Sequence, residues 1–162
     1  MKNIAITCLV LVAVCVGLQA KKTVKAPYFM AASGSQLEIE KVTLGKDTTW
    51  VDAKIYTVSG DDVRIDSTTV LQVAGKRYAY LGGDGFSKGL WTRVPASGEL
   101  SVTLKFEPLP MDAESFDFME MPDNDDKGWC IYGVRLDGKK PAIGVPEKLL
   151  DQQLDYSLPL PE

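Results

Sequence analysis

Histidine is missing from this 162-residue sequence, and its absence restricts the chemistry that the chain can perform. Histidine is the commonest general base, the usual activator of a nucleophilic side chain and a frequent metal ligand. Hydrolysis by a Ser-His-Asp triad and histidine-ligated zinc are therefore excluded. Catalysis by carboxylate or lysine side chains is not excluded, but the sequence shows no recognisable group of such residues. We therefore expect a protein that is not an enzyme, with no catalytic, cofactor-binding or metal-binding residues.

Cysteine offers one candidate for redox chemistry, Cys130 in the segment GWCIYG. No second cysteine stands three residues further on, so the segment is not a Cys-x-x-Cys motif. Cys130 lies in an apolar, strand-like run, where cysteine packs as a small hydrophobic side chain. Cys8 and Cys15 belong to an N-terminal apolar segment that we expect to be removed as a signal peptide. We expect a buried thiol at Cys130 and no disulfide within the mature domain.

The acidic segment MPDNDDKG is the best candidate for a metal site. Asp123 and Asp125 have the spacing of the first two ligands of a calcium loop, and Gly128 stands where such a loop turns sharply. However, Lys127 takes the next ligand position, and Val134 takes the place of the bidentate glutamate. We therefore interpret the segment as a solvated turn between two strands.

The segment GGDGF, from Gly82 to Phe86, resembles part of a phosphate-binding loop. It lacks the lysine and the helix that such a loop requires. We predict that its glycines allow positive φ angles in a long surface loop that runs from Gly82 to Pro95.

Aromatic residues raise the question of carbohydrate binding. Tyr78 and Tyr80 share one face of a predicted strand, and Trp91 lies in the predicted loop. Exposed rings would stack on sugars, whereas buried rings would fill the core of a β-protein. The core interpretation is favoured, and glycan binding stays open as an alternative.

The first 20 residues have the layout of a secretory signal peptide, cut after Ala20. Their apolar stretch, from Ile4 to Leu18, is shorter than the roughly 20 residues that a membrane span needs. Lipidation at Cys15 is the alternative, although Val14 occupies a position where a small residue is expected. We expect export to the periplasm or the cell surface, with membrane contact only if the chain is lipidated.

Apolar residues alternate with polar ones through much of the remaining sequence, which is the period of a strand with one buried face. The clearest run extends from Leu100 to Phe106; Phe116 and Phe118 repeat the period, and residues 129–136 form a further apolar run. Shorter patterns occupy residues 37–42, 50–58, 63–65, 70–73 and 77–81, with a hairpin turn predicted at Ala74 and Gly75. These patterns predict an all-β fold, an immunoglobulin-like antiparallel β-sandwich of about seven strands. The expected core comprises Trp50, Ile55, Val70, Val102, Leu104, Phe106, Phe116 and Ile131.

The predicted organisation has four parts. A signal peptide (1–20) is followed by an extended lead-in (21–36), the β-sandwich domain (37–137) and a linker-like tail (138–162) that contains four prolines. The net charge is −4 and no basic stripe is present, so nucleic acid is not an expected partner.

Several segments together resemble a known family. FEPLP, FDFME and WCIYGVRL, with GKRYAYLGGDGF and KTVKAPYFM before them, resemble the N-terminal β-domain of exported thioredoxin-like (TlpA/redoxin family) proteins of Bacteroidetes. The resemblance extends from about Thr23 to Leu136. The chain also resembles, more distantly, immunoglobulin-like exported domains of the DUF4352 kind. It implies an accessory domain beside a thioredoxin fold. The sequence contains no Cys-x-x-Cys, so the family's redox chemistry is carried over to no residue.

We therefore expect an exported, non-catalytic accessory or protein-interaction module. A glycan-binding module and a redox-pathway partner of a separate thioredoxin are the alternatives. The identity of a protein partner does not follow from the residues.

Overall fold

The computed structural model describes residues 21–84, 86, 88–123 and 128–141. The predicted signal peptide and most of the predicted tail lie outside the described residues. Within the described part the chain consists of strands and turns without any helix, so the all-β prediction is confirmed. It follows that no described segment is a helix suited to crossing a membrane.

The described residues form eleven strands, more than the seven or so expected. Nine of them make one antiparallel sheet in the order β1-β3-β4-β9-β7-β6-β10-β11-β2, and β5 and β8 form a separate two-stranded ribbon. The strands are β1 (Lys22–Lys25), β2 (Ala31–Ala32), β3 (Leu37–Leu44), β4 (Thr49–Tyr56), β5 (Asp62–Val63), β6 (Val70–Val73), β7 (Lys76–Asp84), β8 (Thr92–Arg93), β9 (Glu99–Phe106), β10 (Ser115–Met119) and β11 (Cys130–Arg135).

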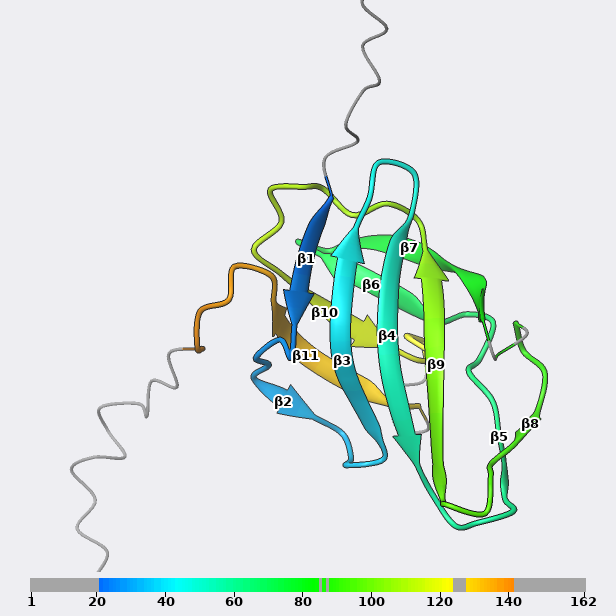
Figure 1. The fold of residues 1–162 in the computed structure, drawn as a ribbon. Coiled ribbons are helices and arrows are strands. Elements are labelled where there is room, and N and C mark those ends of the chain that lie inside the picture. Colours follow the sequence, from blue (N-terminus) through cyan, green and yellow to red (C-terminus); the bar gives the residue numbers. More distant parts are fainter. Residues whose placement is uncertain (1–20, 85, 87, 124–127, 142–162) are drawn as a thin grey trace, which may run out of the picture.

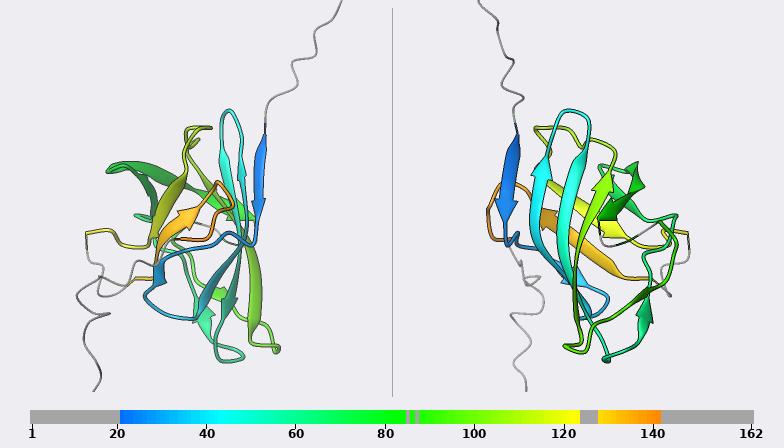
Figure 2. Two further views of the ribbon diagram at one scale, coloured as in Figure 1. Left: turned by 90° about the vertical axis from the view of Figure 1, so that its left-hand side faces the viewer. Right: turned by 45° about the vertical axis from the view of Figure 1, so that its right-hand side comes forward.

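Strand β7 joins the two halves of this sheet. Its first residues, 76–79, pair with β6, whereas Tyr80 and residues 82–84 pair with β9, with a register shift between Tyr80 and Gly82. Such irregularities bend a strand and increase its twist. The sheet therefore curls into a half-barrel, in which β1, β3, β4 and β9 lie in front of β6, β10 and β11 (Figure 1). Figure 2 shows the two halves facing each other when the molecule is turned.

The segment predicted as a lead-in is extended, and it supplies both edge strands of the sheet. β1 pairs with β3, and β2 pairs with β11. Between them, the N–H of Arg135 donates to the carbonyl oxygen of Tyr28 at 2.7 Å, and the N–H of Met30 donates to that of Tyr132 at 2.9 Å. Residues 22–33 thus pair with the edges of both halves and leave only the short strands β1 and β2 at the ends of the sheet, which limits edge-to-edge association.

The core lies inside the curl and largely follows the predicted alternation. Trp50 is only partly buried, so its prediction as a core residue is wrong. In β4 the buried positions are Val51, Ala53 and Ile55, and Trp50 has the opposite phase, on the outer face. There its ring packs over Gly45, where a Cβ atom would lie 2.6 Å from the indole.

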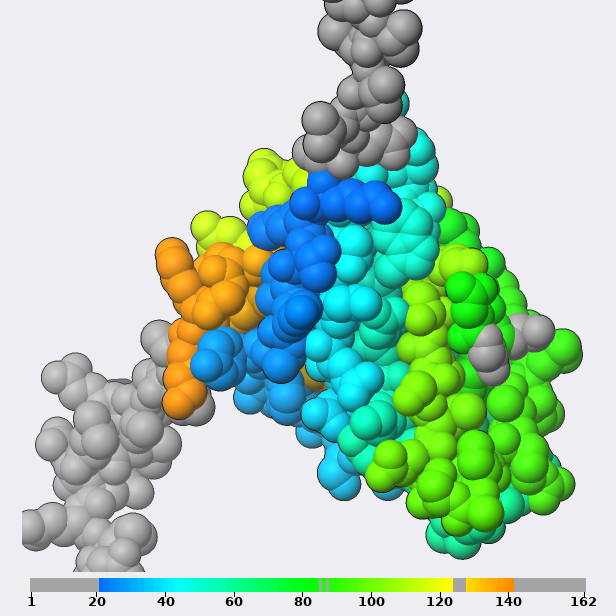
Figure 3. Space-filling model, viewed as in Figure 1, coloured from blue at the N-terminus to red at the C-terminus, as the bar shows by residue number. Residues whose placement is uncertain are grey.

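A bulge in β3 changes which of its residues face the core. Leu37 and Ile39 are buried, and a register shift between Ile39 and Lys41 then brings Val42 and Leu44 to the same side. A strict period of two would have placed Lys41 inward with Ile39. The bulge therefore keeps the lysine on the outer face, where its ammonium lies 2.5 Å from Asp52. Figure 3 shows this outer face of β1, β3, β4 and β9.

Candidate functional site

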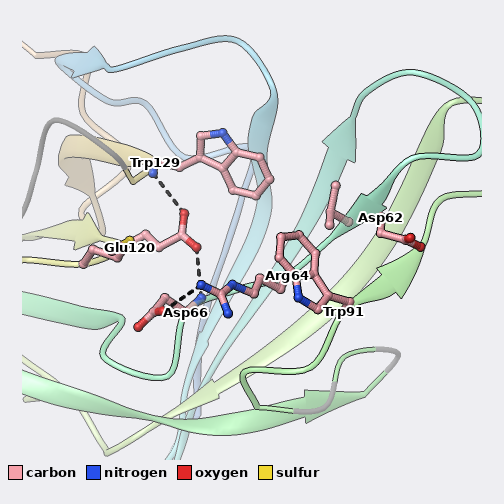
Figure 4. Close-up of a pocket in the computed structure, with 8 residues that line it drawn as sticks. Asp62, Arg64, Asp66, Trp91, Glu120 and Trp129 are labelled. Carbon is pink, nitrogen blue, oxygen red and sulfur yellow. Dashed lines mark hydrogen bonds and ion pairs between the residues drawn. The ribbon is translucent and has the colours of Figure 1, made fainter.

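An open cleft lies between the β5–β8 ribbon and the connection from β10 to β11 (Figure 4). Its volume is about 360 Å³, within the range of small-ligand sites. Its walls combine indole rings with carboxylates and a guanidinium group. The lining residues are Asp62, Val63, Arg64, Asp66, Trp91, Glu120, Met121 and Trp129.

Glu120 is the most buried charged residue in this cleft. It follows β10 in phase with the buried Phe116 and Phe118, and it is 8% exposed. Oε1 accepts a hydrogen bond from the N–H of Asp66 at 2.9 Å, and Oε2 accepts one from the N–H of Trp129 at 3.0 Å. Burial raises the pKa of the Glu120 carboxyl, and the two N–H donors oppose that rise. The side chain thus ties the segment after β5 to the segment before β11.

Asp66 forms a local turn and shares the cleft with Arg64. Its Oδ1 accepts hydrogen bonds from the backbone N–H of Thr68 at 2.8 Å and from the Thr68 hydroxyl at 2.7 Å. These bonds lower the pKa of the Asp66 carboxyl, and Arg64 adds a smaller effect in the same direction. The nearest approach of the Arg64 guanidinium to Asp66 is 3.8 Å. Asp66 therefore remains ionised at neutral pH.

Trp91 forms the exposed wall of the cleft. It precedes β8 and is 64% exposed. The guanidinium carbon of Arg64 lies 4.9 Å from the centroid of the Trp91 ring, in the geometry of a cation–π contact. Across the ribbon, Asp62 is paired with Arg93 at 2.9 Å. The indole is thus held at the rim by Arg64 while most of its surface faces solvent.

Gly128 explains how the β10–β11 connection approaches Glu120. A Cβ atom at this position would lie 2.2 Å from the carbonyl oxygen of Glu120, so only glycine fits without a shift of the backbone. In the candidate calcium loop, Gly128 stood at the position of the sharp turn. In the structure, Gly128 instead lies against the backbone of Glu120. Asp123, the first ligand of that candidate loop, instead forms an ion pair with Arg77 at 2.9 Å. Asp125 and Lys127 lie outside the described residues.

Cys130 lies in β11 and is 1% exposed, so the prediction of a buried thiol is confirmed. Its backbone N–H donates to the hydroxyl of Ser33 in the N-terminal segment at 2.9 Å. A buried thiol in apolar surroundings is poorly reactive.

Of the three aromatic residues considered for sugar stacking, two are buried and one is exposed. Tyr78 and Tyr80 are buried, which confirms the favoured core interpretation for these two rings and excludes them as an exposed platform. The ring of Tyr80 packs against Phe106 at 5.4 Å between centroids. Only Trp91 of the three is exposed, and it is the one that lies in the cleft.

The glycine-rich segment begins as a strand, not as the predicted loop. Gly82 has a φ of +121°, as expected for a permissive glycine, but it belongs to β7 together with Gly83 and Asp84. Asp84 is paired with Lys105 on β9 at 2.9 Å. Phe86 is buried, which anchors the chain after the strand. The predicted surface loop from Gly82 to Pro95 is therefore shorter and contains β8.

The sequence patterns do not single out the charged residues of this cleft. Asp66 and Glu120 stand 54 positions apart and meet only through the curl of the sheet. One signal was available for Glu120, because it continues the inward period of Phe116 and Phe118. A carboxylate on the buried face at the end of a strand indicates a hydrogen-bonding role or a site.

Comparisons with known protein families, with curated proteins and with solved structures found no match to this chain.

Proposed function

We propose that this chain is an exported, non-catalytic accessory module that acts by binding a partner at the cleft described above. The observation that carries the proposal is the exposed Trp91 ring at an open cleft whose charged groups are already engaged. Glu120 is bonded to two backbone N–H groups, Asp66 to Thr68 and Asp62 to Arg93. Groups held in this way favour a preformed binding surface over one that must move protons.

The lack of histidine supports the non-catalytic part of the proposal, since no general base of the commonest type is present. A buried carboxylate with a raised pKa is also a feature of catalytic sites. In this cleft, however, both oxygens of Glu120 accept bonds that hold the local backbone together, and the cleft is open to solvent. We therefore assign Glu120 a non-catalytic role in the cleft.

Export, the resemblance to the N-terminal domain of TlpA-like proteins and the immunoglobulin-like sandwich remain parts of the proposal. The curled antiparallel sheet is compatible with a sandwich whose two faces are bridged by β7 and by residues 22–33. A redox-pathway role beside a separate thioredoxin is the alternative that the resemblance implies. The burial of Cys130 favours binding over a thiol reaction in the chain itself.

Partner capture with three matched proteins tests the proposal. The wild type and the Trp91→Ala and Trp50→Phe variants would each be immobilised and exposed to the exported proteins and glycans of the source cell. We expect a partner that the wild type and Trp50→Phe retain and that Trp91→Ala loses. Trp50→Phe is the control, because Trp50 lies on the outer face of β4. Identical capture by all three proteins, or catalytic turnover that persists in homogeneous protein, would contradict the proposal.

A further inference from the structure

The geometry of the cleft points to a ligand class: we infer that Arg64, Trp91, Glu120 and Trp129 form a binding site for a neutral saccharide. The inference rests on the proposed binding function of the cleft and specifies its ligand. It follows from three properties of the site, which are its aromatic surface, its neighbouring donor and acceptor groups, and its charge balance.

The aromatic surface is supplied by two indoles. Trp91 is 64% exposed, and Trp129 is partly buried against the core. Figure 4 shows both rings bordering the cleft, with Arg64 between Glu120 and Trp91. An indole offers a wide, rigid apolar face at a low cost in conformational entropy. A pyranose ring presents a face of C–H groups that packs on such a surface.

Hydrogen-bond donors and acceptors stand side by side in the cleft. The guanidinium of Arg64 has only donors, whereas the carboxylates of Asp66 and Glu120 have only acceptors when they are ionised. Arg64 approaches Asp66 to 3.8 Å, and its charge also acts on Glu120. A hydroxyl both donates and accepts, so neighbouring hydroxyls of a sugar match a guanidinium beside a carboxylate.

The charged groups of the cleft already have partners, and this disfavours ionic ligands. An anion would approach three carboxylates, those of Asp62, Asp66 and Glu120. A cation would meet the guanidinium of Arg64, which already lies over the Trp91 ring at 4.9 Å. Asp62 and Asp66 already have arginine partners. A neutral ligand rich in hydroxyl groups avoids both repulsions and leaves these pairs intact.

Titration with defined sugars tests the inference. Cellohexaose, xylohexaose, mannohexaose and free glucose would be added to the full chain while tryptophan fluorescence is recorded. The chain has three tryptophans, and Trp50→Phe leaves only the two in the cleft. We expect saturable quenching or a spectral shift with at least one hexasaccharide, in the wild type and in Trp50→Phe. A response to the hexasaccharide without one to glucose would identify a polysaccharide segment as the ligand, and responses to both would identify the single sugar ring.

Two variants locate the binding. Trp91→Ala should weaken the affinity by about tenfold or more, because it removes an aromatic stacking surface. Arg64→Ala should weaken it as well, since it removes the donor group. Both side chains are substantially exposed, so the variants are expected to fold, and circular dichroism would verify this. Binding that is equal in Trp91→Ala and in the wild type would overturn the inference.

A flat response to every sugar would also overturn the saccharide inference. Fluorescence titration with an oligolysine and an oligoglutamate peptide then distinguishes failure of the saccharide inference from failure of the proposed binding function. If a peptide binds in a Trp91-dependent manner, the cleft is a binding site and only its ligand class is wrong. If neither peptide binds and partner capture does not depend on Trp91, the proposed function of the cleft fails too.

Discussion

At the residue scale, the carboxylate of Glu120 and the hydroxyl of Tyr80 are both buried, but within the described part of the chain only the carboxylate has hydrogen-bond partners. Glu120 has a hydrogen-bond donor for each carboxylate oxygen, so its burial links two segments that are distant in sequence. The hydroxyl of Tyr80 is fully buried, and among the described residues it has no hydrogen-bond partner. A buried polar group without a partner costs stability, whereas one with partners contributes specificity of structure.

The Tyr80→Phe variant tests the cost of the unpaired hydroxyl. Burial raises the pKa of Tyr80 to about 12, in agreement with its apolar surroundings. Removal of the hydroxyl should raise the free energy of unfolding by up to about 1 kcal/mol, measured by urea denaturation. Tyr56→Phe is the comparison, because it loses the 2.6 Å bond to Glu38 on the outer face and should change stability by no more than about 0.5 kcal/mol. A clear loss of stability in Tyr80→Phe would show that the hydroxyl is satisfied.

The pH dependence of stability tests the burial of Glu120. Its pKa in the folded protein is raised above the ordinary value of 4.5. The folded state therefore holds the proton more tightly than the unfolded state, and stability falls as the pH rises from about 4.5 through the folded-state pKa. The Glu120→Gln variant has no titrating group at this position. The difference in free energy of unfolding between the wild type and the variant should therefore decrease as the pH rises through the same interval. Parallel curves for the two proteins, recorded between about pH 4 and pH 8, would argue against a raised pKa.

At the scale of elements, the β6–β7 hairpin shows how local geometry determines a connection. Its two turn residues, Ala74 and Gly75, have φ angles of +48° and +81°. Two residues with positive φ form the type I′ turn, whose twist matches that of the flanking strands. The register that results pairs Val73 with Lys76 and places Tyr78 and Tyr80 on the core side.

Substitutions in this turn should separate its two positions. Ala74→Asn should raise the free energy of unfolding by about 0.5–1 kcal/mol, because asparagine adopts positive φ more readily than alanine. Gly75→Ala should lower it by about 1 kcal/mol, since a Cβ atom is strained at that φ. No atom lies within 4 Å of that Cβ position, so the effect is conformational and not a steric clash with a neighbour. Thermal and urea denaturation measure both variants, and a loss of stability in Ala74→Asn would contradict the assignment of the turn.

At the scale of the whole molecule, the N-terminal segment links the two halves of the curled sheet. Residues 22–25 cover the edge of β3, and the chain then crosses to β11 at the other end of the strand order. Val24 packs against the core, and the ammonium of Lys22 donates to the carbonyl oxygen of Ala113 at 3.3 Å. Without this segment, both β3 and β11 would present unpaired backbone groups to solvent.

Removal of the segment should therefore destabilise the whole domain. A chain that begins at Gly34 is expected to lose cooperative thermal unfolding or to aggregate, whereas a chain that begins at Lys21 should melt in one transition. Circular dichroism and size-exclusion chromatography distinguish these results. Equal melting temperatures for the two chains would show that residues 21–33 contribute little to the stability of the sheet.

The sequence by itself determined the all-β class and seven of the eight core positions that it named. The alternation in residues 100–106 correctly predicted a strand and its inward face, and so did the pair Phe116 and Phe118. In a strand, side chains point alternately to the two faces, so the sequence pattern alone shows which residues are buried. The hairpin at Ala74 and Gly75 was predictable for the same reason, since the residues of a short turn reflect its backbone geometry.

Only the tertiary structure decided the inward shift of Val42 and the existence of the cleft. A bulge is a property of the pairing between strands, so a single-strand pattern does not reveal it. The cleft likewise brings together Arg64, Trp91 and Glu120 from separate parts of the chain. Their proximity depends on the long-range pairing of strands and on the curl of the sheet, and neither is encoded in a local pattern of apolar and polar residues.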